Sequence, residues 1–203
     1  MSDYQTEQLE SLRMVRRHLV GLSRKDRCGL IQGAEEYMAF RNETDAFQSE
    51  YFAEVCTASC YRNRLSACCS RDGIISFFAD HVLNALVAAN DELDRLEYVL
   101  TAPHTGYKCV YLSEEGCLWR LKPIVCEMFI CDRARKQVFD KYPAAEIIWN
   151  DLKKKEKQFK WPDRPVLFDD LETIFITAGY RSSLMYLHTS PGLLRVKAKA
   201  GLA

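Results

Sequence analysis

The sequence predicts a mostly α-helical fold, in which a helical scaffold surrounds a cysteine-rich metal-binding core with a short β-hairpin. Three observations predict it. Apolar residues recur at helical spacing in several long segments, the stretch from Pro103 to Cys131 breaks into short β-rich pieces, and eight of nine cysteines fall in two groups. At 203 residues the chain predicts a single domain, with the cysteine-cluster core at about 56–133 and helical extensions on both sides.

The N-terminal half predicts two amphipathic helices. Leucines and valines recur at helical spacing over residues 3–20, and Gly21 is the expected stop. A second helix is expected from about residue 44 to residue 55, because aromatic residues share one face there and Thr44 or Asp45 can cap its start. This helix leads directly into the first cysteine group.

A long helical pattern covers about residues 74–101. As one unbroken helix it would extend roughly 40 Å. The seven residues that follow reach back only about 24 Å when extended. Because a shared metal site requires Cys109 to lie beside Cys68, we expect a kink or stop near Asn90, with the following aspartate as the cap of a second segment.

The rest of the chain predicts a hairpin and further helices. Short β-forming pieces at 109–112 and 117–119 flank the turn-like residues 113–116. The expected helices then run over 133–142, from Pro143 through the lysine-rich run at 153–157, over 166–178 with Gly179 as the stop, and from a cap at Ser190 with Pro191 in the first turn.

The grouping of the cysteines predicts a metal or cluster site. The eight expected ligands are Cys56, Cys60, Cys68 and Cys69 in the first group and Cys109, Cys117, Cys126 and Cys131 in the second. Thiolates select zinc, copper(I) and iron–sulfur clusters. A disulfide framework is typical of small secreted domains, whereas this chain is long and its first residues are polar and acidic. We therefore expect a cytoplasmic protein with reduced thiols.

The spacing leaves the identity of the metal and the number of centres open. Neither group contains a pair of CxxC units, and adjacent cysteines in an extended segment point to opposite sides, so Cys68 and Cys69 can serve two centres or one. Charge compensation for thiolates is available near both groups, from Arg62, Arg64, Arg71, Lys108, Arg120, Lys122 and Arg133, and from backbone N–H groups around Gly73 and Gly116. Cys28 lies outside both groups and is not an expected ligand.

Composition and motifs exclude several function classes. Lys and Arg total 28, equal to Asp and Glu, which argues against general nucleic-acid affinity. No apolar stretch reaches the roughly 20 residues of a membrane span. Neither a P-loop nor a dinucleotide fingerprint is present, and of the four histidines only His104 is placed to serve as a spare ligand. No catalytic residue and no protein partner is predicted.

The segment 108–131 resembles the second half of the YkgJ-type cysteine-cluster family, whose members are described as zinc- or iron-chelating proteins. The matching residues are Gly116, Cys117, Lys122, Pro123, Cys126, Phe129 and Cys131. The first half of the family pattern, CxxCxxCC followed by glycine and an apolar stretch, is matched by Cys68, Cys69, Gly73, Ile74 and Ile75, whereas the upstream pair, Cys56 and Cys60, is spread out. The resemblance implies a bound metal. Some members look like flagellin lysine methylases, which are similar to iron–sulfur proteins.

Three functions remain open from the sequence. The first is a metal-binding protein that holds zinc or an iron–sulfur cluster through the eight cysteines. The second is an iron–sulfur enzyme related to protein lysine methylases, which requires a substrate cleft beside the cluster. The third is a structural zinc domain used for protein interaction, which four buried thiolates and no nearby acid or base would favour.

Overall fold

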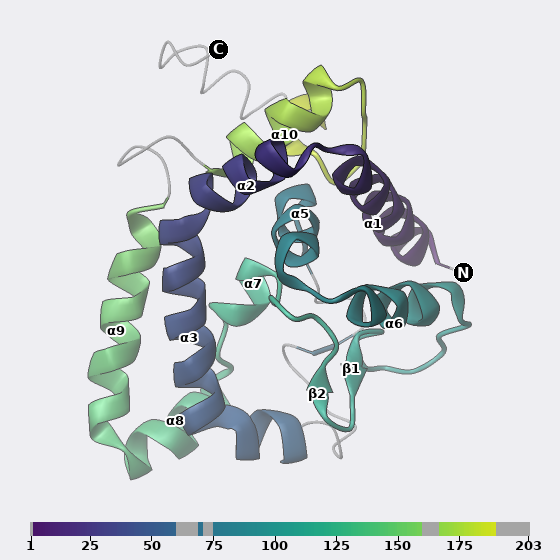
Figure 1. The fold of residues 1–203 in the computed structure, drawn as a ribbon. Helices are drawn as coiled ribbons and strands as arrows, with labels where there is room; N and C mark the ends of the chain where they lie inside the picture. The colour runs from purple at the N-terminus through teal and green to yellow at the C-terminus, as the bar shows by residue number, and fades with distance from the viewer. Residues whose placement is uncertain (1, 60–68, 71–74, 160–166, 190–203) are drawn as a thin grey trace.

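The computed structural model describes residues 2–59, 69–70, 75–159 and 167–189. The fold is mostly helical with one small antiparallel hairpin, as predicted (Figure 1). Two expected ligands, Cys60 and Cys68, lie outside the described residues. So do Arg62, Arg64, Arg71 and Gly73, as well as the predicted C-terminal helix at Ser190 and Pro191.

The first predicted helix is confirmed as α1 (Asp3–Gly21). Ser2 caps it, because its side chain accepts a hydrogen bond from the Gln5 N–H while the Gln5 side chain accepts one from the Ser2 N–H. The buried stripe runs through Leu9, Leu12, Val15 and Leu19 and packs α1 against the middle helices of the chain. Val20, which the spacing placed on the same face, is exposed.

The helix predicted from about residue 44 belongs to a longer helix, and an unpredicted helix precedes it. Helix α2 (Arg24–Gly33) has no buried residue, so its sequence lacks the apolar periodicity that reveals a helix. Helix α3 (Glu35–Ala53) follows almost at once, and the Thr44 hydroxyl donates to the Phe40 carbonyl inside it. Thr44 is therefore a mid-helix residue, and the predicted cap at this position was wrong. A π-helical turn, η1 (Glu54–Ser59), continues α3.

The predicted break in the long helical pattern is confirmed. Helix α5 (Phe78–Val87) stops before Asn90, and helix α6 (Asn90–Thr101) starts there. The cap differs from the prediction, because Glu92 rather than Asp91 accepts the hydrogen bond from the Ala89 N–H, at 2.8 Å. Helix α5 also begins later than the predicted residue 74.

The predicted hairpin is present but shorter, with β1 (Leu112–Ser113) paired to β2 (Gly116–Cys117). Gly116 has a φ of 113°, a conformation that glycine adopts without steric cost. The Ser113 hydroxyl donates to the Gly116 carbonyl and accepts from the Glu115 N–H, which closes the turn.

The remaining described helices follow the hairpin. The short helix α7 (Ile124–Glu127) was not predicted, and α8 (Asp132–Lys141), α9 (Pro143–Lys157) and α10 (Leu167–Thr177) match the predicted helices. Pro143 occupies the first turn of α9 and Gly179 follows α10 with a φ of 88°, as the start and stop signals indicate. Helix α11 (Tyr186–Thr189) ends the described chain.

Figure 1 shows α3 and α9 side by side on one side of the molecule, and α1, α5, α6 and α10 on the other. Helix α7 and the hairpin lie between them. The buried apolar residues form one cluster across both sides. Within the described chain, no helix is long and apolar enough to cross a membrane.

Candidate metal-binding pocket

Five of the predicted ligands line one cavity of about 140 Å³. They are Cys56, Cys69, Cys109, Cys117 and Cys126. These cysteines come from η1, from the segment before α5, from the loop before the hairpin, from β2 and from α7. Both sequence groups are thus represented around a single pocket, which we call the thiol pocket.

A backbone contact joins the two cysteine groups. The Cys109 N–H donates to the Cys69 carbonyl at 2.9 Å, and Ser70 pairs with Lys108 in an isolated antiparallel bridge. The sequence required Cys109 to return beside the first group, and the break between α5 and α6 permits it. This bridge sets the register of the two groups.

Backbone N–H groups point at two of the sulfur atoms. The Tyr111 N–H donates to the Cys109 Sγ at 3.3 Å, and the Trp119 backbone N–H lowers the pKa of the Cys117 thiol. In each case the donor lies two residues after the cysteine. A hydrogen bond to sulfur stabilises the thiolate, which is the form that binds a metal. The local backbone therefore favours anionic sulfur at both positions.

Burial opposes that tendency. It raises the pKa of the Cys109 and Cys117 thiols, and the neighbouring Cys117 and Cys126 thiols raise the pKa of Cys109 further. The Lys122 ammonium lowers the pKa of Cys117, but this effect is smaller than the rise caused by burial. Binding of a cation would therefore have to displace protons from these thiols, as metal binding by cysteines does.

The other walls of the thiol pocket are largely apolar. Phe52 comes from α3, Pro123 precedes α7, and the Tyr111 and Trp119 rings pack edge to face with centroids 5.4 Å apart. Phe52, Tyr111 and Trp119 are buried. An apolar shell limits solvent access, and access in turn controls the redox potential of a metal site.

A buried ion pair holds the segment that contains Cys126. Arg41 of α3 is paired with Glu127 of α7, and both side chains are inaccessible to solvent. The Arg41 guanidinium also donates to the Lys122 carbonyl and to the Tyr37 hydroxyl. Burial raises the pKa of Glu127, and the charge of Arg41 opposes that rise.

Two side chains of α5 hold the same segment by accepting hydrogen bonds from its backbone N–H groups. Asn84 accepts from the Leu121 N–H at 2.8 Å, and Asp80 accepts from the Ile124 N–H at 3.1 Å. Asp80 also accepts from the Phe77 N–H at the start of α5. Burial raises the pKa of Asp80 to about 6, although Arg41 and these two N–H groups lower it.

A neutral cluster lies behind the segment that contains Cys109. The side-chain oxygen of Gln8, on α1, is within hydrogen-bonding distance of Ser76, His81 and Tyr111, at 2.7, 3.0 and 3.1 Å. All four side chains are buried. Burial lowers the pKa of His81 to about 3, so the imidazole is neutral at physiological pH.

Other predicted residues lie away from the thiol pocket. Cys131 caps the start of α8 and is half-buried, but it is not part of the pocket lining. The His104 imidazole forms a hydrogen bond with the Lys108 carbonyl at 2.7 Å, within the loop that precedes the hairpin. Cys28 is exposed on α2.

Of the predicted compensating cations whose side chains are described, Lys122 alone lines the pocket. Among the described residues, no three His, Cys, Asp or Glu side chains converge closely enough to hold one metal ion. Two of the eight predicted ligands, Cys60 and Cys68, lie outside the described residues.

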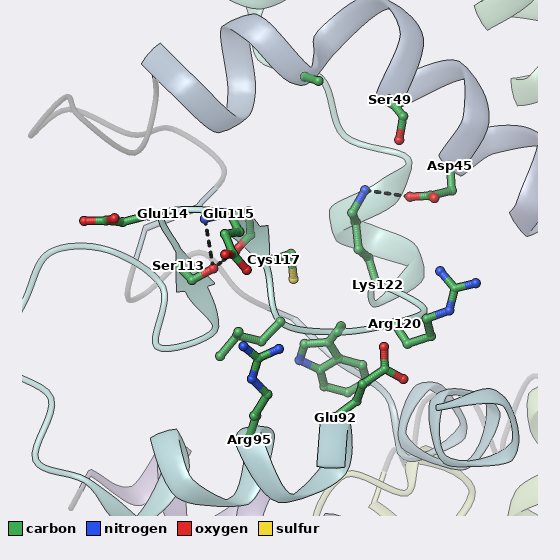
Figure 2. Close-up of a pocket in the computed structure, with 14 residues that line it drawn as sticks. Asp45, Ser49, Glu92, Arg95, Ser113, Glu114, Glu115, Cys117, Arg120 and Lys122 are labelled. Atoms are coloured by element: carbon green, nitrogen blue, oxygen red, sulfur yellow. Dashed lines mark hydrogen bonds and ion pairs between the residues drawn. The ribbon is translucent and has the colours of Figure 1, made fainter. Parts of the chain in front are cut away.

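A larger hollow of about 980 Å³ adjoins the thiol pocket (Figure 2). The two cavities share Ser49, Ala53, Cys117, Trp119 and Lys122 as a common wall. We call this hollow the charged cleft, because half of its fourteen lining residues are charged. Neither the cleft nor the Arg41–Glu127 pair was predicted, since both depend on residues far apart in the sequence.

Comparison with known proteins gave no relative. No family model, no curated protein and no solved structure matches this chain. The resemblance to the YkgJ-type family therefore stays a prediction.

Proposed function

We propose that this chain is a metal-binding protein that holds zinc or an iron–sulfur cluster through its cysteines. The observation that supports the proposal is the gathering of five thiols, from five separate segments, around one small cavity. Cysteines without a common role would scatter over the core, because free thiols behave as small apolar residues. The remaining three predicted ligands, Cys60, Cys68 and Cys131, belong to the proposal as well.

The chemistry of the donors fits such a group. Thiolates are soft ligands suited to zinc and to iron–sulfur clusters. The Cys109 sulfur accepts a backbone N–H group, and such hydrogen bonds help to set the redox potential in cluster proteins. When bound, zinc would supply folding energy, and a cluster would supply electron transfer. The resemblance of residues 108–131 to the YkgJ-type family supports the same proposal.

The composition of the purified protein tests the proposal directly. The full chain is purified without oxygen, its absorption spectrum is recorded, and its zinc, iron and acid-labile sulfide are measured. We expect either a brown protein with iron and sulfide or a colourless protein with zinc. Protein free of all three after purification from metal-replete cells would contradict the proposal.

Serine variants identify the ligands. Cys109→Ser, Cys117→Ser, Cys126→Ser and Cys131→Ser are each expected to lower the metal content and the melting temperature, because a bound structural metal contributes on the order of 10 kcal/mol to folding. Cys28→Ser is the matched control, since this thiol is exposed and does not line the pocket. It should retain the metal and its unfolding free energy within about 1 kcal/mol. A quadruple variant with full metal content would refute the ligand set.

An enzyme is a second candidate, and the charged cleft favours it. An enzyme that uses the metal needs space for a substrate beside the ligands, and the cleft shares Cys117 with the thiol pocket. A purely structural zinc domain is less well supported, because Glu127 and Asp80 place buried carboxylates near the pocket segment. The metal analysis separates these candidates, since iron and sulfide would exclude the structural zinc domain.

A further inference from the structure

The charged cleft is built from four parts of the chain. Helix α3 contributes one wall, α6 contributes a second, the hairpin a third, and residues 118–122 connect the hairpin to the thiol pocket. In Figure 2, Arg95 rises from α6 toward the hairpin, and Arg120 extends toward the side on which Asp45 and Lys122 meet. Two guanidinium groups thus flank the hollow from different elements.

The charges that line the cleft are not equally engaged. Lys122 pairs with Asp45 at 2.8 Å, and Glu92 accepts the Ala89 N–H. Within the part of the chain that the structure describes, neither Arg95 nor Arg120 is in an ion pair or a side-chain hydrogen bond. Both guanidinium groups are therefore available to a ligand.

One of the two unpaired arginines, Arg120, is close in the chain to the wall that the cleft shares with the thiol pocket. Arg120 lies in the chain between Trp119 and Lys122, two residues of the shared wall. Three acidic lining residues have no ion pair within the described chain: Glu114 and Glu115, which are exposed at the tip of the hairpin, and Glu92, which is half-buried and accepts the Ala89 N–H. A ligand that enters the cleft between Arg95 and Arg120 meets two guanidinium groups, whose planar forks match a carboxylate or a phosphate.

We infer that the charged cleft binds a small anionic ligand, a carboxylate or a phosphate, through Arg95 and Arg120. A volume of about 980 Å³ is ample for such a ligand. The anion site itself depends only on the cleft. That the bound ligand serves as substrate beside the thiols rests on the proposed function.

Calorimetric titration of the anaerobically purified full chain tests the inference, with glutarate and inorganic phosphate as the two probes. We expect one of them to bind with a millimolar or lower Kd and to bind more weakly at high salt, because both arginines are exposed. The better probe tells which anion class the cleft prefers. Cadaverine, a dication of similar length to glutarate, is the opposing probe.

Arginine variants assign the binding to the cleft. Arg95→Gln and Arg120→Gln should each raise the Kd about tenfold, as expected for loss of one charge-assisted hydrogen bond, and the double variant should abolish binding. Arg17→Gln, an exposed arginine of α1 outside the cleft, is the matched control. Because all three side chains are exposed, melting curves should be unchanged, so loss of binding cannot be ascribed to unfolding.

The possible results separate the two proposals. Metal-loaded protein that binds neither anion, binds cadaverine instead, or binds an anion equally well as the double variant overturns the cleft inference alone. Protein without metal that still binds glutarate or phosphate through the two arginines contradicts the metal proposal alone. Zinc, iron and sulfide are therefore measured on every sample that is titrated.

Discussion

The two segments that supply Cys126 and Cys109 are anchored to the helices by different chemistry. The segment that contains Cys126 is held by charges, because Arg41 is paired with the next residue, Glu127, out of contact with solvent. The segment after Cys109 is held by a neutral cluster in which Gln8 binds Tyr111. Both anchors are buried and both adjoin the same pocket.

The difference shows two ways to fix a loop on an apolar core. A buried ion pair is costly to desolvate, and removing one partner leaves the other charge unpaired. A neutral cluster costs less to bury, and its loss leaves only unpaired dipoles. The charged anchor should therefore be the more sensitive to substitution, whereas the neutral anchor, which contains a histidine, should be the more sensitive to pH.

The largest effect is expected from breaking the charged anchor. Arg41→Met removes the partner of Glu127 and three hydrogen bonds, so we expect a loss of about 3–5 kcal/mol in unfolding free energy, measured by urea denaturation. The metal content should fall with it, because Cys126 directly precedes Glu127.

A double variant sharpens this test. Arg41→Met combined with Glu127→Leu removes both charges, and we expect it to recover much of the lost stability because no unpaired charge remains. Equal instability of the single and double variants would show that the hydrogen bonds to the 122–127 segment, rather than the ion pair, hold it in place.

Breaking the neutral anchor should cost less. Gln8→Leu leaves three buried polar groups without their shared acceptor, so we expect a loss of about 1–3 kcal/mol. Thermal unfolding followed by circular dichroism measures it. The comparison would be wrong if Gln8→Leu proved more destabilising than Arg41→Met.

The pH dependence of stability should differ in sign between two buried groups of α5, His81 of the neutral anchor and Asp80. The unfolded chain protonates His81 as the pH falls through 6.5, whereas the folded chain does not until about pH 3. Between about pH 6.5 and pH 3 the unfolded state therefore binds more protons than the folded state. As the pH is lowered through this range, the free energy of unfolding decreases by up to about 1.4 kcal/mol per pH unit. Asp80 has the opposite effect, because its folded pKa of about 6 lies above its ordinary value.

His81→Gln isolates the histidine contribution. The variant keeps a donor toward Gln8 but cannot titrate, and the Asp80 contribution cancels in the difference between the two proteins. We expect the variant to gain stability relative to the parent as the pH is lowered from 7 toward 4, in urea titrations at several pH values. A difference that does not change with pH would mean that His81 is not buried and neutral.

The smallest effect is expected from a second ion pair, between Lys122 and Asp45, which is partly exposed to solvent. Lys122 and Asp45 form an ion pair with side chains 26% and 41% exposed. Asp45→Asn should therefore change the unfolding free energy by at most about 1 kcal/mol. A loss as large as that of Arg41→Met would show that burial is not what distinguishes the two pairs.

Local signals in the sequence were sufficient for most helices. The stripe of α1, Pro143 at the start of α9 and Gly179 after α10 act within a few residues, so they can be predicted without the fold. The break before Asn90 followed from chain geometry. Helix α2 was missed because it has no buried residue, and a helix without an apolar face gives no periodic signal.

The sequence grouped the cysteines but did not indicate what supports them, and their role as metal ligands stays a prediction. The cysteine spacing indicated which thiols gather, and the five that line the pocket are among the eight expected. Arg41 lies 86 residues from Glu127, and Gln8 lies 103 residues from Tyr111. No local pattern links residues that far apart, so the anchors and the charged cleft are evident only from the folded chain.

The bridge between Ser70 and Lys108 has a consequence for the order of folding. The hydrogen bond from Cys109 to Cys69 closes a loop of about 40 residues, and the entropy of closing such a loop costs roughly 3 kcal/mol if the loop is a flexible chain. Helices α5 and α6 lie within this loop and pack on α1, so we expect their docking to bring the ends of the loop together before the bridge forms. We therefore expect the cysteines to meet late, which would leave their thiols open to ions in solution while the helices assemble.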